Sequence, residues 1–201
     1  MNTDVVIVGG FHEIIELCGE CGLNVVGIID NSLHDSYYGV PVIGNDADAE
    51  SLYSKYRGCE LIIAPDFPKV REKLVGRYKS LGYRFATVIS PFAHVSKYSV
   101  IGEGTIIQSG VNVSSATQIG SFCKLNCYCN VMHDNNIGDF TTVAPNAVLL
   151  GRVTIGIASY VGANSTLLPN IKIGSGATVG AGAVVTRDVA DNIIVKGVPA
   201  K

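Results

Sequence analysis

The chain has 201 residues, a net charge of −2 and a sequence pI of about 6.1. This balance gives no electrostatic footprint for nucleic acid or for an anionic membrane surface, so neither is expected as a partner. Hydrophobic residues make up 47% of the chain, but no apolar run approaches the roughly 18 residues of a membrane-spanning helix, so a soluble protein is expected.

The first residues and the cysteines indicate the cellular compartment in which the protein is expected. Met1–Asp4 lacks the basic segment, apolar stretch and small-residue cleavage site of a secretory signal, so a cytoplasmic location is expected. The six cysteines are then expected to be reduced and packed rather than bridged. Cys18 and Cys21 form one CxxC pair, and zinc binding is the weaker alternative because no second pair matches it.

The N-terminal half alternates apolar runs with helical patterns. Val5–Val8 predicts a buried strand that enters a Gly9–Gly10 turn, and residues 12–21 have helical spacing. Further elements are predicted as strands at Val25–Ile29, Leu61–Ala64 and Tyr83–Ile89, and as a helix from Pro68 to Leu81 with Lys and Arg on its outer face. This alternation predicts a small parallel-sheet α/β domain.

Ligands of such a sheet bind at the carboxyl ends of its strands. Those ends carry Gly9–Gly10, Asp30–Asn31 and Ala64–Asp66 in this chain. The dinucleotide signature G-x-G-x-x-G is absent, which disfavours an NAD-dependent oxidoreductase. A glycine-rich turn at a helix N-terminus still suits phosphate, so a nucleotide-like ligand is expected.

A six-residue repeat runs through the second half of the chain. Every sixth position from Ile89 to Val185 is aliphatic. Glycine follows the aliphatic residue every eighteen positions, at Gly102, Gly120, Gly138, Gly156 and Gly174. Because eighteen is three sixes, we predict coils with three short faces that stack as a triangular prism of parallel strands. An α-helix would need apolar spacing near 3.6 instead.

This repeat resembles the hexapeptide left-handed β-helix, and the ending Gly197-Val198-Pro199-Ala200-Lys201 is similar to the G-x-P-A-K tail of acyltransferases in that superfamily. With the α/β half in front, the chain resembles the bacterial acetyl-CoA-dependent acetyltransferases of nucleotide-linked amino sugars, such as the bacillosamine and perosamine pathway enzymes and the sialic acid O-acetyltransferase-like proteins. The resemblance implies a small Rossmann-like sugar-nucleotide-binding domain over residues 1–88, an all-β left-handed parallel β-helix over 89–189, and a tail over 190–201 near the coenzyme A site.

Acetyl transfer needs a base, and histidine is the natural one near neutral pH. His34 falls in a predicted loop and His94 in the first coil, so surface or packing roles are expected for both. His133 comes two positions after the inward Val131, from where it can project off the prism, and Asp134 follows it. The resemblance implies that His133 is the general base and that Asp134 orients it. Adjacent residues of a regular strand point to opposite faces, so their contact requires a bend.

The resemblance also implies roles for the coenzyme A side of the reaction. Gly151, eighteen residues after His133, matches the glycine whose amide faces the acetyl carbonyl and would supply an oxyanion donor. Thr142, Ala163 and Ala181 match positions that line the coenzyme A channel. Small residues are also what any coil edge needs, which is the competing interpretation.

For the acceptor, the resemblance implies that Asn126 lies near the amino sugar. Asp30, Asn31 and Pro65 match nucleotide-binding positions, and the diphosphate is expected at Gly9, Gly10 and His12. A surface residue at a helix start is the equal alternative for His12. Members of the family usually have a longer glycine-rich turn than Gly9–Gly10.

The implied reaction moves an acetyl group from acetyl-CoA to the amino group of a nucleotide-linked 4-amino sugar by direct attack in a ternary complex. No Cys or Ser adjoins a base, so no acyl-enzyme is expected. O-acetylation of a sugar or sialic acid hydroxyl is the alternative, and a noncatalytic scaffold is a weaker one. No metal is expected, because His94 and His133 alone cannot build a three-histidine zinc site. The family forms trimers with active sites between subunits, which implies a homotrimer.

Overall fold

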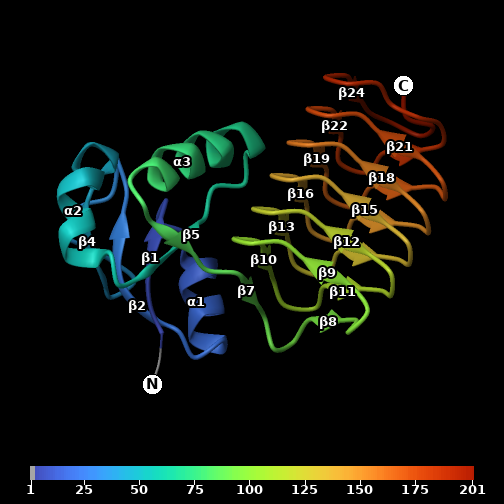
Figure 1. Cartoon of the computed structure of the whole chain (residues 1–201). Helices are drawn as coiled ribbons and strands as arrows, with labels where there is room; N and C mark the ends of the chain where they lie inside the picture. Colours follow the sequence, from blue (N-terminus) through green and yellow to red (C-terminus); the bar gives the residue numbers. More distant parts are fainter. Residues whose placement is uncertain (1–2) are drawn as a thin grey trace.

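A computed structural model describes residues 3–201 and divides them between a small α/β sheet and a stack of short parallel strands (Figure 1). The N-terminal elements are β1 (Asp4–Val8), α1 (His12–Glu20), β2 (Asn24–Ile29), β3 (Ser36–Tyr37), β4 (Val40–Gly44), α2 (Ala49–Tyr56), β5 (Glu60–Ile63), α3 (Pro68–Ser80) and β6 (Arg84–Phe85). A 3-10 turn at Asp46–Asp48 leads into α2. None of the helices in the described residues is long and apolar enough to cross a membrane.

The N-terminal sheet has the strand order β3-β4-β2-β1-β5-β6, and all its pairs are parallel except the β3–β4 hairpin. The register pairs Val8 of β1 with Ile29 of β2 and Ile63 of β5. These three strands therefore end together, which brings the residues that follow them to one edge of the sheet.

The predicted Rossmann-like class is confirmed, with differences in detail. The sequence patterns identified β1, α1, β2, β5 and α3, but they missed β3, β4 and α2. Pro41 interrupts the apolar pattern of β4, and α2 follows a polar segment in which Asn45 and Asp48 form a capping box. The single strand predicted at Tyr83–Ile89 is wrong. The chain leaves the sheet after β6, and Val88–Ile89 pairs with the second half of the protein.

The second half is a triangular prism built from strands of two residues each. Its strands are β7 (Val88–Ile89), β8 (His94–Val95), β9 (Val100–Ile101), β10 (Ile106–Ile107), β11 (Asn112–Val113), β12 (Gln118–Ile119), β13 (Lys124–Leu125), β14 (Asn130–Val131), β15 (Asn136–Ile137), β16 (Thr142–Val143), β17 (Val148–Leu149), β18 (Thr154–Ile155), β19 (Tyr160–Val161), β20 (Thr166–Leu167), β21 (Lys172–Ile173), β22 (Thr178–Val179), β23 (Val184–Val185) and β24 (Ile194–Val195). They form three parallel sheets, β7-β10-β13-β16-β19-β22-β24, β8-β11-β14-β17-β20-β23 and β9-β12-β15-β18-β21. This is the predicted left-handed parallel β-helix.

The corners of the prism from Gly104 to Gly182 are each made by a residue in the left-handed backbone region. This residue is the third after the inward aliphatic one, as at Asp134 (φ 59°) after Val131 and Arg152 (φ 60°) after Leu149. Left-handed backbone is unfavourable for side chains other than Gly and Asn, so the repeat must maintain it by pairing above and below. The same bend changes the direction of the side chains beside it.

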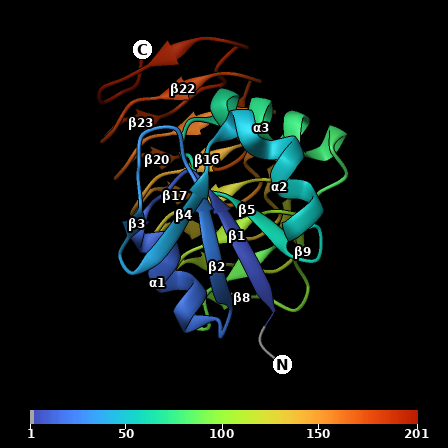
Figure 2. The same cartoon turned by 90° about the vertical axis from the view of Figure 1, so that its left-hand side faces the viewer.

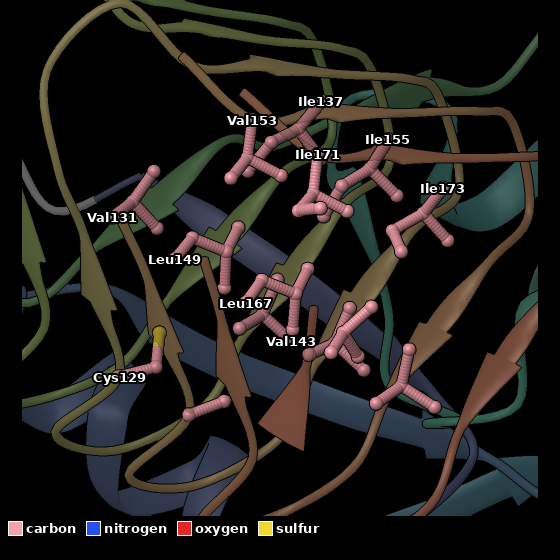
Figure 3. Close-up of a cluster of buried hydrophobic side chains, with 14 of the residues drawn as sticks. Cys129, Val131, Ile137, Val143, Leu149, Val153, Ile155, Leu167, Ile171 and Ile173 are labelled. Carbon is pink, nitrogen blue, oxygen red and sulfur yellow. The ribbon is translucent and has the colours of Figure 1, made fainter. Parts of the chain in front are cut away.

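The interior of the prism is one layer of side chains. Val131, Leu149 and Leu167 are successive partners in the strand register, and all three are fully buried (Figure 3). Each side chain thus packs on its equivalents one coil above and below. No second layer of residues is available to fill a gap.

The N-terminal sheet and the prism meet at the sheet that contains β13 and β16, which faces α3 (Figures 1 and 2). Arg71 of α3 is 1% exposed and donates to the carbonyl oxygens of Phe122 at 2.7 Å, Phe140 at 2.6 Å and Pro65 at 2.7 Å. Burial lowers its pKa to about 10. Arg71 is therefore not on the outer face of α3, where the sequence pattern had placed it. The Phe122 ring packs between those of Phe85 and Phe140 at the same contact.

We expect Leu149→Ala to lower the free energy of unfolding by about 2–5 kcal/mol, because the cavity left in a single layer cannot be filled by neighbours. Urea denaturation followed by circular dichroism measures this loss. Ile157→Ala is the matched control, since Ile157 is 50% exposed on the same prism and its loss should cost no more than about 0.5 kcal/mol. Equal effects of the two substitutions would contradict the single-layer core.

Candidate active site

A cavity of about 240 Å³ lies at the edge where β1, β2 and β5 end. It is lined by Gly9, Gly10, Phe11, Asp30, Ala64, Pro65, Asp66 and Lys124. The structure thus brings the predicted Gly9, Gly10, Asp30 and Pro65 together. It adds two residues that the sequence analysis did not single out, Asp66 and Lys124.

The glycines permit a tight packing of this edge. Gly9 has φ +84°, and a Cβ atom there would lie 3.0 Å from the Pro65 ring. A Cβ on Gly10 would lie 2.3 Å from Leu33. Gly9 therefore requires glycine, a side chain at Gly10 would displace Leu33, and the turn presents backbone rather than side chains to the cavity.

Asp30 fixes this turn. Its Oδ2 accepts from the Gly10 amide at 2.8 Å, and its Oδ1 accepts from the amides of Ser32 and Leu33 and from the Ser32 hydroxyl. Burial raises the pKa of Asp30, but these hydrogen bonds outweigh it and bring the pKa below its usual value. Asp30 is an ionised carboxylate whose two oxygens are already engaged.

The start of α1 adds an anion-binding element beside the turn. Phe11 is the N-cap residue and gives no side-chain hydrogen bond to the helix, so the first N–H groups remain available. His12 is directed elsewhere: its Nδ1 lies 3.2 Å from the Tyr37 hydroxyl, and its ring stacks on Tyr38. The structure does not place His12 in the cavity lining.

Asn31 is exposed and belongs to a neighbouring hollow of about 250 Å³ that shares Gly9, Asp30 and Pro65 with the first cavity. Its side chain donates to Asp46 Oδ2 at 2.8 Å and accepts from the Asp46 amide at 3.1 Å. Asn31 is thus near the other predicted nucleotide positions but points toward Asp46.

Asp66, Lys124 and Asn126 form a polar cluster between the cavity and the prism. Lys124 Nζ lies 2.8 Å from Asp66 Oδ1 and donates to the Ala64 carbonyl at 2.8 Å. Asn126 Nδ2 donates to the same Asp66 oxygen at 3.4 Å. The Lys124 side chain is 1% exposed and that of Asp66 is 43% exposed. Burial lowers the pKa of Lys124, and the Asp66 carboxylate opposes that shift.

His133 and Asp134 occupy a prism corner after β14, away from this cavity. The left-handed backbone of Asp134 supplies the bend that their contact requires, and His133 Nδ1 lies 2.7 Å from Asp134 Oδ2. Both side chains are half exposed. Gly151 is one coil further on, after β17, and a Cβ atom there would lie 2.6 Å from His133 Cε1. Only glycine leaves room for the imidazole at this position.

The predicted coenzyme A positions divide between two corners. Ala163 follows β19 and Ala181 follows β22, so they stack at the corner that also carries Asn126 after β13. Gly151 belongs to the His133 corner. The backbone N–H groups of Gly151, Ala163 and Ala181 have no acceptor among residues 3–201, so they are free to bind a ligand.

Thr142 does not join either group. It is fully buried in β16, where its hydroxyl donates to the Asp66 carbonyl at 2.6 Å and accepts from Arg71 at 2.9 Å. It therefore connects the prism to the N-terminal sheet, and no face of its side chain is open in this chain.

Three residues that organise the cavity gave little signal in the sequence. Arg71 is one of several Lys and Arg residues in its helical segment, and Asp66 follows a strand end like any loop acid. Lys124 is the single Lys or Arg between Lys97 and Arg152. Lys124 and Ala64 are 60 positions apart, so no local pattern relates them. The one available clue is that Lys124 replaces an apolar residue found at the equivalent positions Val88 and Ile106.

Comparisons with known proteins agree with the fold. Residues 152–187 match a family model described as bacterial transferase hexapeptide (six repeats). None of the curated proteins gives a significant match.

Several solved structures match over nearly the whole chain. A histidine-to-alanine mutant of GDP-perosamine N-acetyl transferase from Caulobacter crescentus, in complex with CoA and GDP-perosamine, is 32% identical with a TM-score of 0.94, over 98% of this chain and 95% of that one. The acetyltransferase domain of PglB from Neisseria gonorrhoeae, in complex with acetyl coenzyme A, is 29% identical with a TM-score of 0.92, over 100% and 99%. WeeI from Acinetobacter baumannii is 29% identical with a TM-score of 0.87, over 99% of both chains.

We expect Asp66→Asn to destabilise the fold by about 2 kcal/mol at neutral pH, because it leaves the buried Lys124 ammonium without its counter-ion while partial exposure of the site moderates the loss. Since the pKa of Lys124 is lowered in the folded state, the unfolded chain binds more protons at intermediate pH. The loss should therefore shrink as the pH rises through the lowered pKa. Urea unfolding at about pH 7 and about pH 9.5 tests this.

The exposed Glu72 on α3 provides the control for this experiment. Glu72→Gln should change stability little at either pH. An equal loss of stability for Asp66→Asn at both pH values would contradict a Lys124 pKa that is lowered by burial.

Proposed function

Because the chain belongs to the bacterial sugar-nucleotide N-acetyltransferases with a hexapeptide-repeat left-handed β-helix, we propose that it transfers an acetyl group from acetyl-CoA to the amino group of a nucleotide-linked amino sugar. The observation that carries this proposal is the His133–Asp134 pair, held at 2.7 Å on a prism corner against Gly151. A half-exposed histidine with its tautomer fixed by a carboxylate is suited to remove a proton from an incoming nucleophile.

His133 acts as the general base in this proposal. With its Nδ1–H donated to Asp134, Nε2 keeps the lone pair that accepts a proton from the sugar amine as that amine attacks. Asp134 orients the ring and stabilises the imidazolium that results. The amine attacks directly in a ternary complex, so no group on the chain carries the acetyl group.

Acetyl-CoA is held by the two prism corners. The free N–H of Gly151, beside His133, is the donor for the thioester oxygen on which charge develops. The free N–H groups and small side chains of Ala163 and Ala181 provide a narrow backbone surface for the pantetheine arm. The tail over residues 190–201 lies at the end of the same stack. Thr142 has a bridging role instead, because its hydroxyl is bound to Arg71 and Asp66.

Residues 1–88 hold the nucleotide in this proposal, and the prism over 89–189 performs the transfer. The diphosphate lies at Gly9–Gly10 and the start of α1, where amides face the cavity. Asn31 and Pro65 flank the nucleoside, while Asp30 maintains the turn. His12 keeps a packing role against Tyr37 and Tyr38, since it does not line the cavity.

A homotrimer completes the site. In one chain, the nucleotide cavity and Asn126 lie at one corner of the prism, and His133 with Gly151 lies at the next. His133 has a side-chain hydrogen bond only to Asp134 among residues 3–201. We therefore propose that the acceptor held by one subunit meets His133 of its neighbour, which gives three shared sites.

O-acetylation of a sugar or sialic acid hydroxyl is the second candidate. The same base would activate a hydroxyl, so the acceptor alone separates the two reactions. We also propose a cytoplasmic location, because acetyl-CoA is the donor and the six cysteines are free thiols. Incubation with acetyl-CoA and UDP-, GDP- or dTDP-linked 4-amino sugars, followed by detection of free CoA, tests the amine as acceptor. Turnover only with hydroxyl acceptors would favour the second candidate.

His133→Ala should lower kcat by about 10²- to 10⁴-fold with little change in the KM for acetyl-CoA, because the substitution removes the base and leaves the binding surfaces intact. Steady-state release of CoA measures both constants. His94→Ala is the matched control, since His94 is exposed on the first coil and should retain full activity. Undiminished turnover in His133→Ala would contradict the assignment of His133 as the general base.

Light scattering should give three times the mass of the 21.2 kDa chain. Shared sites add a sharper test, because His133→Ala and Asn126→Ala disable opposite sides of each site. When the two variants are co-expressed in equal amounts, about a quarter of all sites in the randomly assembled trimers combine both intact sides, so activity should rise above that of either variant alone, to about that fraction of the wild type. A monomeric mass, or mixed trimers without activity, would contradict a shared site.

A further inference from the structure

Lys124 puts a charge on a buried prism face, between the apolar Ile106 on one side and the polar Thr142 on the other. Its partners in the register below it are Ile106 and Val88, and all three residues are 1% exposed. The ammonium group has two oxygen partners, on Ala64 and Asp66, and lies 5.2 Å from the centre of the Phe11 ring. A buried ion pair is rarely better for stability than apolar residues of similar size, so packing alone does not explain this lysine.

Lys124 is one of several residues that hold Asp66 in place. Its Oδ1 receives Lys124 at 2.8 Å and Asn126 at 3.4 Å. Its backbone carbonyl receives Arg71 at 3.0 Å and Thr142 at 2.6 Å. Its Oδ2 has no hydrogen-bond partner among residues 3–201. The fold thus immobilises one carboxylate oxygen and leaves the other open.

Asp66 lines the same cavity as the glycine turn. Gly9 and Gly10 contribute backbone to its lining and Phe11 begins α1, while Asp66 and Lys124 contribute charged side chains. Asp30 also lines the cavity, but both of its oxygens accept hydrogen bonds from the chain itself. Of the two carboxylates that line this cavity, Asp66 is therefore the one with an oxygen that accepts no hydrogen bond from the described residues.

We propose that Asp66 is a substrate-binding residue whose open oxygen accepts a hydrogen bond from a ring hydroxyl of the acceptor sugar, with Lys124 and Asn126 as its positioning residues. This inference rests on the proposed function. It assigns the glycine turn to the diphosphate and Asp66 to the sugar.

The chemistry of the alternatives favours a hydroxyl. A diphosphate at Asp66 would meet a like charge. The acceptor amine at Asp66 would be stabilised as an ammonium ion, which opposes an attack that requires the neutral amine. A hydroxyl has neither conflict, and its hydrogen bond to an ionised carboxylate is stronger than one between neutral groups.

Calorimetric binding of a nucleotide sugar and of the matching bare nucleotide separates these two assignments. The probes are UDP-, GDP- and dTDP-linked 4-amino-4,6-dideoxy sugars, each compared with UDP, GDP or dTDP. The main variant combines Asp66→Ala with Lys124→Met, so that no buried charge is left without a partner. Lys124→Met alone keeps the carboxylate but removes its anchor. Phe67→Ala is the matched control, since Phe67 is in the same loop but lines a different groove.

We expect the paired variant to bind the nucleotide sugar about 10- to 100-fold more weakly and the bare nucleotide within about twofold of the wild type. Lys124→Met should weaken sugar binding by about fivefold, because an unanchored carboxylate must be ordered by the ligand. It should also raise the KM for the acceptor but not for acetyl-CoA, which a general loss of structure would not do. Phe67→Ala should change neither affinity.

If the paired variant binds the nucleotide sugar and the bare nucleotide with equally reduced affinity, or with unchanged affinity, the assignment of Asp66 is overturned. Turnover by the wild type would still support the proposed function. If the paired variant does not fold, Lys124→Met decides: an unchanged ratio of the two affinities overturns the inference. A wild type that neither binds nor acetylates any of these sugars would contradict the proposed function, and the inference with it.

Discussion

The protein depends on one constraint that is repeated through its second half. Every sixth residue fills a prism interior that is one side chain thick, and from Gly104 to Gly182 the backbone adopts the left-handed region three residues after each of these positions. These two requirements set the position of everything on the outside. Residues eighteen apart are stacked at about 4.8 Å, so the position of a side chain at a corner follows from its number in the chain.

The corner geometry explains how His133 meets Asp134 and why Gly151 lies beside it. The left-handed turn at Asp134 brings together two adjacent side chains that a strand would separate. The eighteen-residue period then places residue 151 directly against the imidazole, where any side chain would displace it. The turn recurs at every corner from Gly104 to Gly182. His133 and Asp134 make this one turn polar, and the proposed general base rests on them.

This is also the part of the site that could be predicted from the sequence. The prism, its corners and the His133–Gly151 pair follow from a period that is visible within eighteen residues. The cluster of Asp66 and Lys124 could not be predicted in the same way, because it depends on how the N-terminal sheet packs against the prism. Arg71 shows the difference clearly: its helical segment looks like an exposed basic face, but the side chain is buried against Phe122 and Phe140. The predicted role of Thr142 also overlooked this docking, since the position belongs to the covered face.

The docking contact itself is built from cations that donate to backbone carbonyls. Arg71 and Lys124 together engage the carbonyl oxygens of Ala64, Pro65 and Asp66, so the loop after β5 is fixed to the prism by its main chain. Main-chain anchoring leaves the side chain of Asp66 available and fixes its distance from Asn126. Apolar packing could join the two halves with less desolvation, but it would not specify where the carboxylate of this loop lies. The buried charges of Arg71 and Lys124 therefore make better sense as a means of orienting the cavity relative to the prism than as a contribution to the free energy of unfolding.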